Sequence, residues 1–346
     1  MNTRHRQAGL SLVELMISMT LGLIILSGVL VVFVNTSAAR TEVERTSRQI
    51  ENGRYASELL TEDIRLAGFY GELNVSQVAA PGAIPANPCS ITPADWKTWI
   101  PFHLQGFDDV GVPAATCTLT NRKAATDVLV IRRARACVAG STGCDAAVTN
   151  KGYLQVALCA DQAATIATAY KLGLEGTETF DRQKRNCLAA NPAEKRQYLV
   201  HVYFVADDNG QGESIPTLKR LELTTNGTWE TVPLVEGIEE FQLHYGLDTN
   251  GDGVPDVYIA DPNDYPAGAC NAACQVTNWL NVMTVQFHIL ARNIETSPNY
   301  TDGKTYNLGK KADGSAFAVT PGGAYRRHIY TGLVRIPNPA GRKDTP

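Results

Sequence analysis

The sequence lacks the short motifs that mark the commonest classes of enzyme. It contains no HExxH metalloprotease motif, no GxSxG nucleophile elbow and no Gly-rich phosphate loop that ends in Lys-Ser or Lys-Thr. The histidines on predicted strands, His201, His244 and His288, are ordinary sheet residues in our interpretation, since no pattern groups them with a nucleophile. We therefore expect no enzymatic activity.

The sequence also lacks an excess of charge and any feature that would divide its main part. Charged residues make up 19 % of the 346 residues and the formal net charge is −4, which argues against general binding of nucleic acid. One basic cluster, Arg132-Arg133-Ala134-Arg135, allows contact with DNA or an acidic partner, but we favour a solvated strand end. Without an internal repeat or a Gly/Ser-rich linker, the hydrophobic residues are expected to build one sizeable domain.

An apolar run near the N-terminus is the first feature that indicates where the protein acts. It extends from Leu10 to Val34 and covers 25 residues, or roughly 38 Å of helix, which is enough to cross a bilayer. The preceding leader carries Arg4 and Arg6, so the positive-inside rule keeps the N-terminus in the cytoplasm and exports the rest. Cleavage at Gly9 would remove the leader, leave the span attached and change the formal charge to −6.

Glu14 is the one acidic residue inside this run. A carboxylate within a spanning helix costs roughly 2.5–3.5 kcal/mol and persists mainly where a partner compensates it. The new amine of Leu10, created by cleavage after Gly9, is such a partner when it belongs to a neighbouring subunit. The alternative is that Glu14 lies close enough to the helix end to reach headgroup water.

The segment Leu10-Ser11-Leu12-Val13-Glu14-Leu15-Met16, preceded by Gly9, resembles the N-terminus of type IV prepilins. In that family a membrane peptidase cuts after the Gly and methylates the new amine. The resemblance implies that Gly9 is the cleavage residue, Leu10 the methylated N-terminus and Glu14 the assembly residue. Leu10 replaces the more usual Phe, a position at which other apolar residues also occur.

The helix is expected to continue beyond the membrane, because no proline interrupts residues 35–70. A stripe of apolar residues on this helix predicts contact with a globular head: Ala56, Leu60, Ile64 and Ala67. Four charged residues are expected to face water: Arg48, Glu51, Glu58 and Glu62. Gly68 and Gly71 are expected to end the helix. We therefore divide the chain into a leader (1–9), a transmembrane half-helix (10–34), an amphipathic half-helix (35–70) and an exported head (71–346).

Two segments of this helix narrow the resemblance to the PilW family of minor pilins. They are Glu51-Asn52-Gly53-Arg54-Tyr55-Ala56 and Asp63-Ile64-Arg65-Leu66-Ala67-Gly68-Phe69. The C-terminal segment Tyr325-Arg326-Arg327-His328-Ile329-Tyr330-Thr331-Gly332-Leu333-Val334-Arg335-Ile336 also resembles the closing strand of that family. Residues 72–230 carry little of the resemblance.

Strand patterns dominate the head after residues 72–126, which we expect to be surface loops with short strands at most. The predicted strands are 127–132, 153–158, 197–205, 218–223, 238–245, 282–290 and 328–336. In one of them Val285, Phe287 and Ile289 alternate with Thr284, Gln286 and His288, so one face should meet the core and the other water. We predict an α+β, pilin-like fold in which the long helix packs on an antiparallel sheet.

Eight cysteines lie on the predicted exported side, where an even number favours disulfides. Among 105 connectivities we favour the sequential one, because each pair encloses a short or moderate loop: Cys89–Cys117, Cys137–Cys144, Cys159–Cys187 and Cys270–Cys274. Zinc is the rival interpretation, but no CxxC spacing occurs and the six histidines are scattered.

An Asp-rich segment, Asp248-Thr249-Asn250-Gly251-Asp252-Gly253-Val254-Pro255-Asp256, follows one predicted strand. Its alternating oxygen ligands resemble the first part of an EF-hand loop and predict a structural calcium site with Asp248, Asn250, Asp252, the carbonyl of Val254 and Asp256. Ile259 stands where an EF-hand carries its bidentate Glu, so Asp256 or Asp261 would have to complete a weaker site. The alternative is an Asx-rich turn without metal.

The resemblance as a whole implies a minor pilin that joins other minor pilins in the inner membrane, primes type IV pilus assembly and suits the fibre tip. Its implied partners are prepilin peptidase and the minor and major pilins, which it contacts through the N-terminal helix. The head would lie in the periplasm and then on the cell-surface fibre. A GspJ-like minor pseudopilin of type II secretion and an anchored calcium-dependent adhesin are the alternatives.

Overall fold

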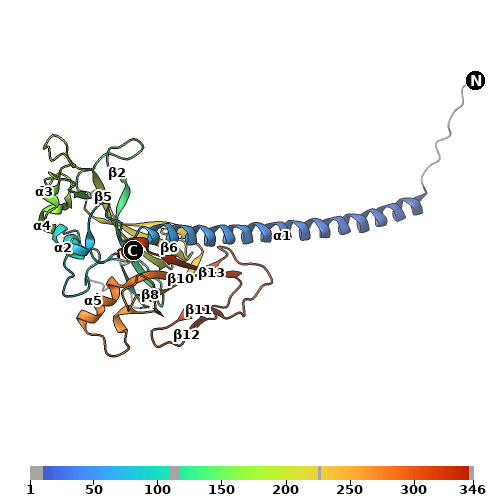
Figure 1. Cartoon of the computed structure of the whole chain (residues 1–346). Coiled ribbons are helices and arrows are strands. Elements are labelled where there is room, and N and C mark those ends of the chain that lie inside the picture. The colour runs from blue at the N-terminus through green and yellow to red at the C-terminus, as the bar shows by residue number, and fades with distance from the viewer. Residues whose placement is uncertain (1–10, 110–116, 225–226, 343–346) are drawn as a thin grey trace, which may run out of the picture. The chain divides into compact units, whose positions relative to one another are not determined.

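The protein is an α+β molecule with one long helix and antiparallel sheets, as the sequence predicts (Figure 1). The computed structural model describes residues 11–109, 117–224 and 227–342. Its internal contacts divide into two units, of which the first ends at Arg48 and the second begins at Gln49. The compact head unit therefore begins 22 residues earlier than the expected boundary at residue 71.

Helix α1 (Leu12–Arg65) contains the whole described part of the apolar run. Its apolar side chains up to Val34 are exposed, and α1 is the one helix among the described residues that is long and apolar enough to cross a membrane. No proline interrupts it, in agreement with the expected continuous helix.

The part of α1 that belongs to the head unit is amphipathic in the predicted way. Ala56, Leu60 and Ile64 are completely buried, and Ala67 is buried just after the helix ends. Glu51, Glu58 and Glu62 are exposed, as is Arg48 in the first unit. Gly68 and Gly71 follow the helix with φ angles of 70° and 61°, the left-handed conformation that glycine adopts readily.

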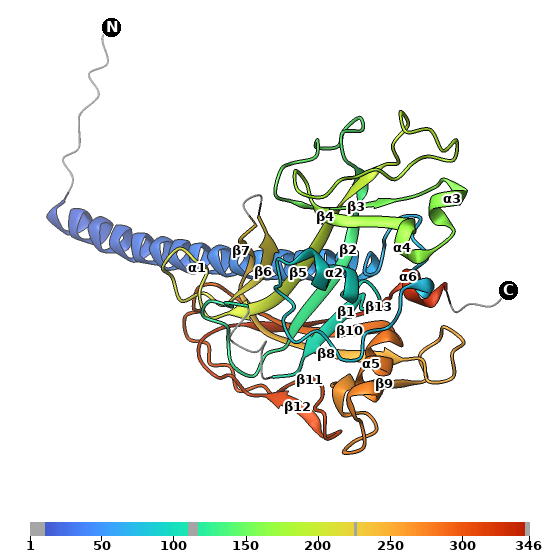
Figure 2. The same ribbon diagram turned by 90° about the vertical axis from the view of Figure 1, so that its left-hand side faces the viewer.

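The larger sheet of the head contains seven strands among the described residues (Figure 2). Strand β5 is central, because it pairs with β2 along one edge and with β3 and then β6 along the other. All pairs are antiparallel. The strands are β1 (Leu104–Phe107), β2 (Val128–Val138), β3 (Gly152–Val156), β4 (Tyr170–Leu174), β5 (Lys195–Ala206), β6 (Thr217–Leu223) and β7 (Trp229–Glu236).

The second sheet has the order β13-β10-β8-β9, again antiparallel, and a separate hairpin is formed by β11 and β12. In the middle of this sheet Phe287 lies opposite Leu243 on one neighbour and Gly332 on the other. The strands are β8 (Ile238–Leu247), β9 (Val257–Ile259), β10 (Val282–Arg292), β11 (Tyr306–Lys310), β12 (Ala316–Val319) and β13 (Arg327–Arg335).

Short helices connect the strands. They are η1 (Val75–Gln77), α2 (Pro93–Trp99), α3 (Ala160–Ala163), α4 (Ile166–Ala169), η2 (Pro262–Asp264), α5 (Ala272–Leu280) and α6 (Pro337–Ala340).

The main core lies where the head part of α1 and both sheets meet. Leu60 of α1, Ile131 of β2 and Phe287 of β10 belong to the same buried cluster. A second cluster, which contains Trp96 of α2 and Val202 of β5, covers the opposite face of the larger sheet. The larger sheet is therefore covered on both faces, and α1 is part of the main core.

All seven predicted strands are confirmed, with ends shifted by a few residues. The expectation over 72–126 allowed a short strand such as β1, but it is wrong for helix α2 and for the surface position, because Trp96 and Leu104 are buried. The expectation that Thr284 and His288 face water is also wrong. The β11–β12 hairpin lies over this face, and Tyr258 of β9 accepts a hydrogen bond from Thr284 Oγ1 at 3.3 Å.

The attachment of α1 to the second sheet predicts a strict requirement for glycine at position 53. A Cβ atom at Gly53 would lie 2.1 Å from Cε2 of Tyr330 on β13. We expect Gly53→Ala to lower the free energy of unfolding by about 1–3 kcal/mol, because the tyrosine must leave its position. Denaturant unfolding of the full chain in detergent measures this.

Gly82→Ala is the matched control, since nothing lies within 4 Å of the added Cβ atom. Adding Tyr330→Ala to Gly53→Ala tests the cause. Equal losses for Gly53→Ala with and without the tyrosine would show that the clash is not responsible.

Candidate functional site

The N-terminal assembly residues are described only in part. Gly9 and Leu10, the expected cleavage and methylation residues, lie outside the described residues. Glu14 lies in the first turn of α1, where its Oε2 accepts a hydrogen bond from the backbone N–H of Ser11 at 3.1 Å. Its side chain is exposed, so contact with the amine of another subunit is sterically open.

A buried carboxylate, Asp63, joins the head part of α1 to the larger sheet. His201 Nδ1 and the Tyr203 hydroxyl each donate to Asp63 Oδ2 at 2.7 Å, and Arg133 Nε donates to Oδ1 at 2.6 Å. Its side chain is 6 % exposed. Burial by itself raises the pKa of Asp63, but the charge and hydrogen bond of His201, the charge of Arg133 and the hydrogen bond of Tyr203 outweigh it and hold the pKa well below the usual range.

Backbone carbonyls of the head receive further hydrogen bonds from α1. Gln49 Nε2 donates to Ala291 O at 2.8 Å, and Asn52 Nδ2 donates to Glu236 O at 3.0 Å. Asn52, Gly53 and Asp63 all belong to the segments that carry the PilW resemblance. Those segments therefore hold the helix on both sheets, a role that helical periodicity alone does not indicate.

The paired arginines of the C-terminal segment have different surroundings. Arg327 is buried at the start of β13, where Nε donates to Glu239 Oε2 at 2.5 Å and Nη1 donates to Asp302 Oδ2 at 2.8 Å. Burial by itself lowers the pKa of Arg327, but the bonds to both carboxylates outweigh it and raise the pKa. Arg326 lies over the Tyr300 ring at 4.6 Å. Arg327 therefore links three segments that are distant in sequence.

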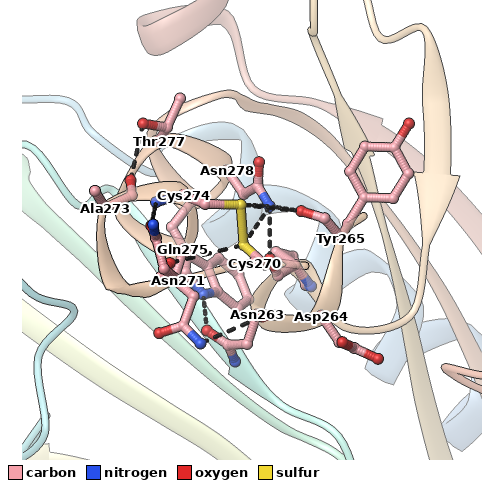
Figure 3. Close-up of a disulfide and its surroundings, with 12 residues drawn as sticks. Asn263, Asp264, Tyr265, Cys270, Asn271, Ala273, Cys274, Gln275, Thr277 and Asn278 are labelled. Carbon is pink, nitrogen blue, oxygen red and sulfur yellow. Dashed lines mark hydrogen bonds between the residues drawn. A yellow bond between two sulfur atoms is a disulfide. The ribbon is translucent and has the colours of Figure 1, made fainter. Parts of the chain in front are cut away.

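The eight cysteines form the four sequential disulfides, and none is free. Figure 3 shows Cys270–Cys274 at the start of α5, where the Asn271 side chain accepts from the Cys274 N–H at 3.0 Å. Asn278 Nδ2 donates to the Tyr265 carbonyl at 2.5 Å across the same loop. With every cysteine in a disulfide, no thiolate is left to hold zinc.

The Asp-rich segment forms the turn between β8 and β9, with strands on both sides in place of EF-hand helices. Asp248 is completely buried, and its two oxygens accept from the N–H groups of Gly251 at 2.6 Å and Gly253 at 3.0 Å. Asp256 Oδ2 accepts from Thr249 N and Oγ1, both at 2.8 Å. The Val254 side chain is exposed, and Ile259 pairs with Tyr245 as a strand residue.

The orientation of the Asn250 side-chain amide determines whether this turn offers oxygen ligands to a cation. Its Nδ2 donates to Asp252 Oδ2 at 3.3 Å and to Asp256 Oδ1 at 3.2 Å, so an amide nitrogen stands between the carboxylates. A half-turn of the amide would present its oxygen to these carboxylates in place of the nitrogen, and it would give up the hydrogen bond that Oδ1 accepts from the Asp252 N–H at 3.0 Å. The residue types therefore fit calcium once this amide has rotated.

A different carboxylate group, which the sequence analysis missed, is the tighter one. Asp108, Asp109 and Asp127 hold carboxylate oxygens within 4.8 Å of one another, whereas the Asp-rich turn forms no such group among the described residues. Burial and the neighbouring Asp109 raise the pKa of Asp108 to about 6. Burial and Asp108 also raise the pKa of Asp127. Asp127 directly precedes β2 and the other two follow β1, so only the pairing of these strands brings them together.

The basic cluster is not a solvated strand end, contrary to our interpretation of the sequence. Arg132 is completely buried, and Arg133 is paired with Asp63. Arg135 is the exposed member and pairs with Asp145 at 2.9 Å. The alternation of β2 explains the difference, since Arg132 points to the opposite face from Arg133 and Arg135.

An apolar helix that is long enough to cross a membrane and continues into the core of a β-rich head is typical of pilin-like proteins. Family comparison agrees: the prokaryotic N-terminal methylation motif matches residues 4–30, and type IV pilus-assembly protein W matches residues 202–338. The chain is thereby identified as a type IV pilus-related pilin that matches the PilW family of minor pilins. Comparisons with curated proteins and with solved structures give no match. These matches indicate a structural pilin rather than an enzyme.

The Asp63 cluster predicts how the head responds to acid. Because the pKa of Asp63 is lower in the folded than in the unfolded protein, its stabilisation is present above about pH 4 and is lost as the pH falls through the folded value. We expect Asp63→Asn to cost about 3–5 kcal/mol at pH 7, since it leaves Arg133 and His201 without their buried partner. Denaturant unfolding at pH 7 and pH 3 measures both effects.

Asp145→Asn is the matched control. Asp145 also pairs with an arginine of β2, but its side chain is 77 % exposed, so its loss should cost less than about 1 kcal/mol. A similar small loss for both variants would remove Asp63 from its central role.

Proposed function

We propose that this chain is a minor pilin that joins an inner-membrane complex of minor pilins, initiates type IV pilus assembly and occupies the fibre tip. The observation that carries the proposal is the continuity of α1. One uninterrupted helix contains the exposed Glu14 and apolar run at one end and Ala56, Leu60 and Asp63 of the head core at the other. The same helix would therefore carry the assembly residue and contribute to the core of the head.

The size and composition of the head support the tip position. A subunit at the tip has no subunit stacked above it, so a large head with four disulfides and three separate buried clusters is tolerated there. A membrane-anchored pilin of this kind would begin with its head in the periplasm and be cleaved by prepilin peptidase after Gly9. Its neighbours would be other minor pilins and the major pilin.

Glu14→Ala tests the assembly role. We expect a loss of most sheared surface pili, because the replaced carboxylate can no longer pair with the amine of a neighbour. The measurement is immunoblotting of sheared pili, with the variant's level in the membrane fraction as the reference. Glu58→Ala is the control, since Glu58 is an exposed acid on the same helix. Equal piliation by the two variants would contradict the role of Glu14.

Deletion of the gene separates the alternatives. Loss of pili with normal type II secretion supports the minor pilin, whereas normal pili with lost secretion would move the chain to the GspJ-like pseudopilins. No change in either would favour an anchored adhesin. Complementation with the intact chain controls for effects on neighbouring genes.

We also propose that the Asp-rich turn binds calcium as a structural ion. Asp248, Asn250, Asp252, the Val254 carbonyl and Asp256 would hold it after rotation of the Asn250 amide. A bound ion would fix the β8–β9 connection. The ion would stabilise the folded head by mass action.

Thermal unfolding of the full chain in detergent, with 1 mM calcium or with chelator, tests this site. We expect calcium to raise the melting temperature of the wild type and of Asp109→Asn, but not of Asp252→Asn. If calcium raised the melting temperature of Asp252→Asn but not of Asp109→Asn, the ion would lie at the cluster of Asp108, Asp109 and Asp127. Coincident curves for the wild type would end the calcium proposal.

A further inference from the structure

A buried cation without an acidic partner lies in the second core cluster of the head. Arg132 of β2 is completely buried on the face of the larger sheet opposite α1. Its Nη2 donates to Gln105 Oε1 at 3.1 Å, and its guanidinium lies over the Trp99 ring at 5.6 Å. Its Nε and Nη1 have no hydrogen-bond partner. No carboxylate pairs with it among the described residues.

Two tyrosine hydroxyls beside Arg132 are unpartnered as well. Tyr70 and Tyr198 are 2 % and 3 % exposed, and neither hydroxyl makes a hydrogen bond. Their rings stack with centroids 6.3 Å apart. Both hydroxyls interact electrostatically with Arg132, so the three buried side chains are neighbours in this part of the core.

Four buried polar atoms of these three neighbouring side chains therefore lack hydrogen-bond partners, although buried polar groups in folded proteins are nearly always hydrogen-bonded. Nε and Nη1 are donors only, and the hydroxyls can also donate. Water would satisfy the hydrogen bonds but would leave the buried positive charge uncompensated. A small anion accepts from all of these donors and also balances the charge.

We propose that Arg132, Tyr70 and Tyr198 form an internal binding site for a small monovalent anion of the halide class, with chloride as the physiological occupant. This inference is independent of the proposed role in pilus assembly and of the Asp-rich turn. The ion replaces the missing carboxylate partner of Arg132. It thereby holds β2, β5 and the segment that follows α1 around a common centre.

The aromatic neighbours supply a direct readout. Trp99 lies against Arg132, and the ring of Trp96 is 5.5 Å from that of Tyr198. Bromide is a heavy-atom quencher of tryptophan fluorescence. In the full chain in detergent, bromide bound at this site should quench part of the emission along a saturating curve, whereas random collisions give a linear dependence.

Thermal unfolding in sodium chloride and in sodium gluconate of equal ionic strength is the second measurement. With chloride at tenfold its dissociation constant, we expect the melting temperature to be about 3 °C higher than in gluconate. Arg132→Met should abolish both the shift and the saturating quenching. Tyr70→Phe and Tyr198→Phe should each weaken bromide binding about fivefold and keep the fold.

Arg135→Met is the control, because Arg135 lies on the same strand but is exposed and paired with Asp145. It should keep the saturating quenching and the chloride effect. Linear quenching and equal melting temperatures in the two salts would show that water alone fills the site. Saturating quenching that survives in Arg132→Met, or that keeps the wild-type affinity in both tyrosine variants, would place the anion elsewhere, and either result would overturn the proposal.

Discussion

The buried carboxylate of Asp63 is the constraint on which the head depends. A charged group that is almost completely buried is tolerated only when partners compensate it, and here a histidine, an arginine and a tyrosine do so together. All three partners come from β2 and β5, the central strands of the larger sheet. The cluster therefore fixes both the depth and the rotation of the helix on the sheet. The apolar contacts of Leu60 and Ile64 bury surface between the helix and the sheet. The charge network around Asp63 has a defined geometry, so it also selects one position of the helix along the sheet.

The head uses buried cations repeatedly, and each time at a junction between segments distant in sequence. Arg133 joins β2 to α1, and Arg327 joins β13 to Glu239 and Asp302. Arg132 of β2 donates to Gln105 of β1 and has no carboxylate partner among the described residues. In the two ion-paired cases, each charge compensates its buried neighbour, so loss of either partner would leave an unpaired buried charge. The Cys89–Cys117 disulfide closes a segment that also contributes Trp96 and Leu104 to the two core clusters.

Much of the fold could be predicted because its signals are local. The spacing of Ala56, Leu60 and Ile64 identifies the buried face of α1, and the alternation of Phe287 and Ile289 identifies a strand. Short sequence separations likewise favoured the sequential disulfides. The alternating pattern of a strand predicted burial wrongly where another part of the chain covers the face that was expected to meet water. His288 alternates like a solvent-facing residue, but the β11–β12 hairpin buries it, and no local pattern reports the position of a hairpin that is distant along the chain.

The sequence by itself determined that this is a pilin: the leader, the apolar run, Glu14 and the helix segments are contiguous patterns whose meaning does not depend on distant residues. The tertiary structure alone decided which charged residues became structural. Asp63 meets Arg133, His201 and Tyr203 across separations of 70, 138 and 140 residues. The carboxylates of Asp108, Asp109 and Asp127 converge only through the pairing of β1 with β2. Burial and electrostatic partnership depend on which surfaces meet, and that is a property of the folded chain as a whole.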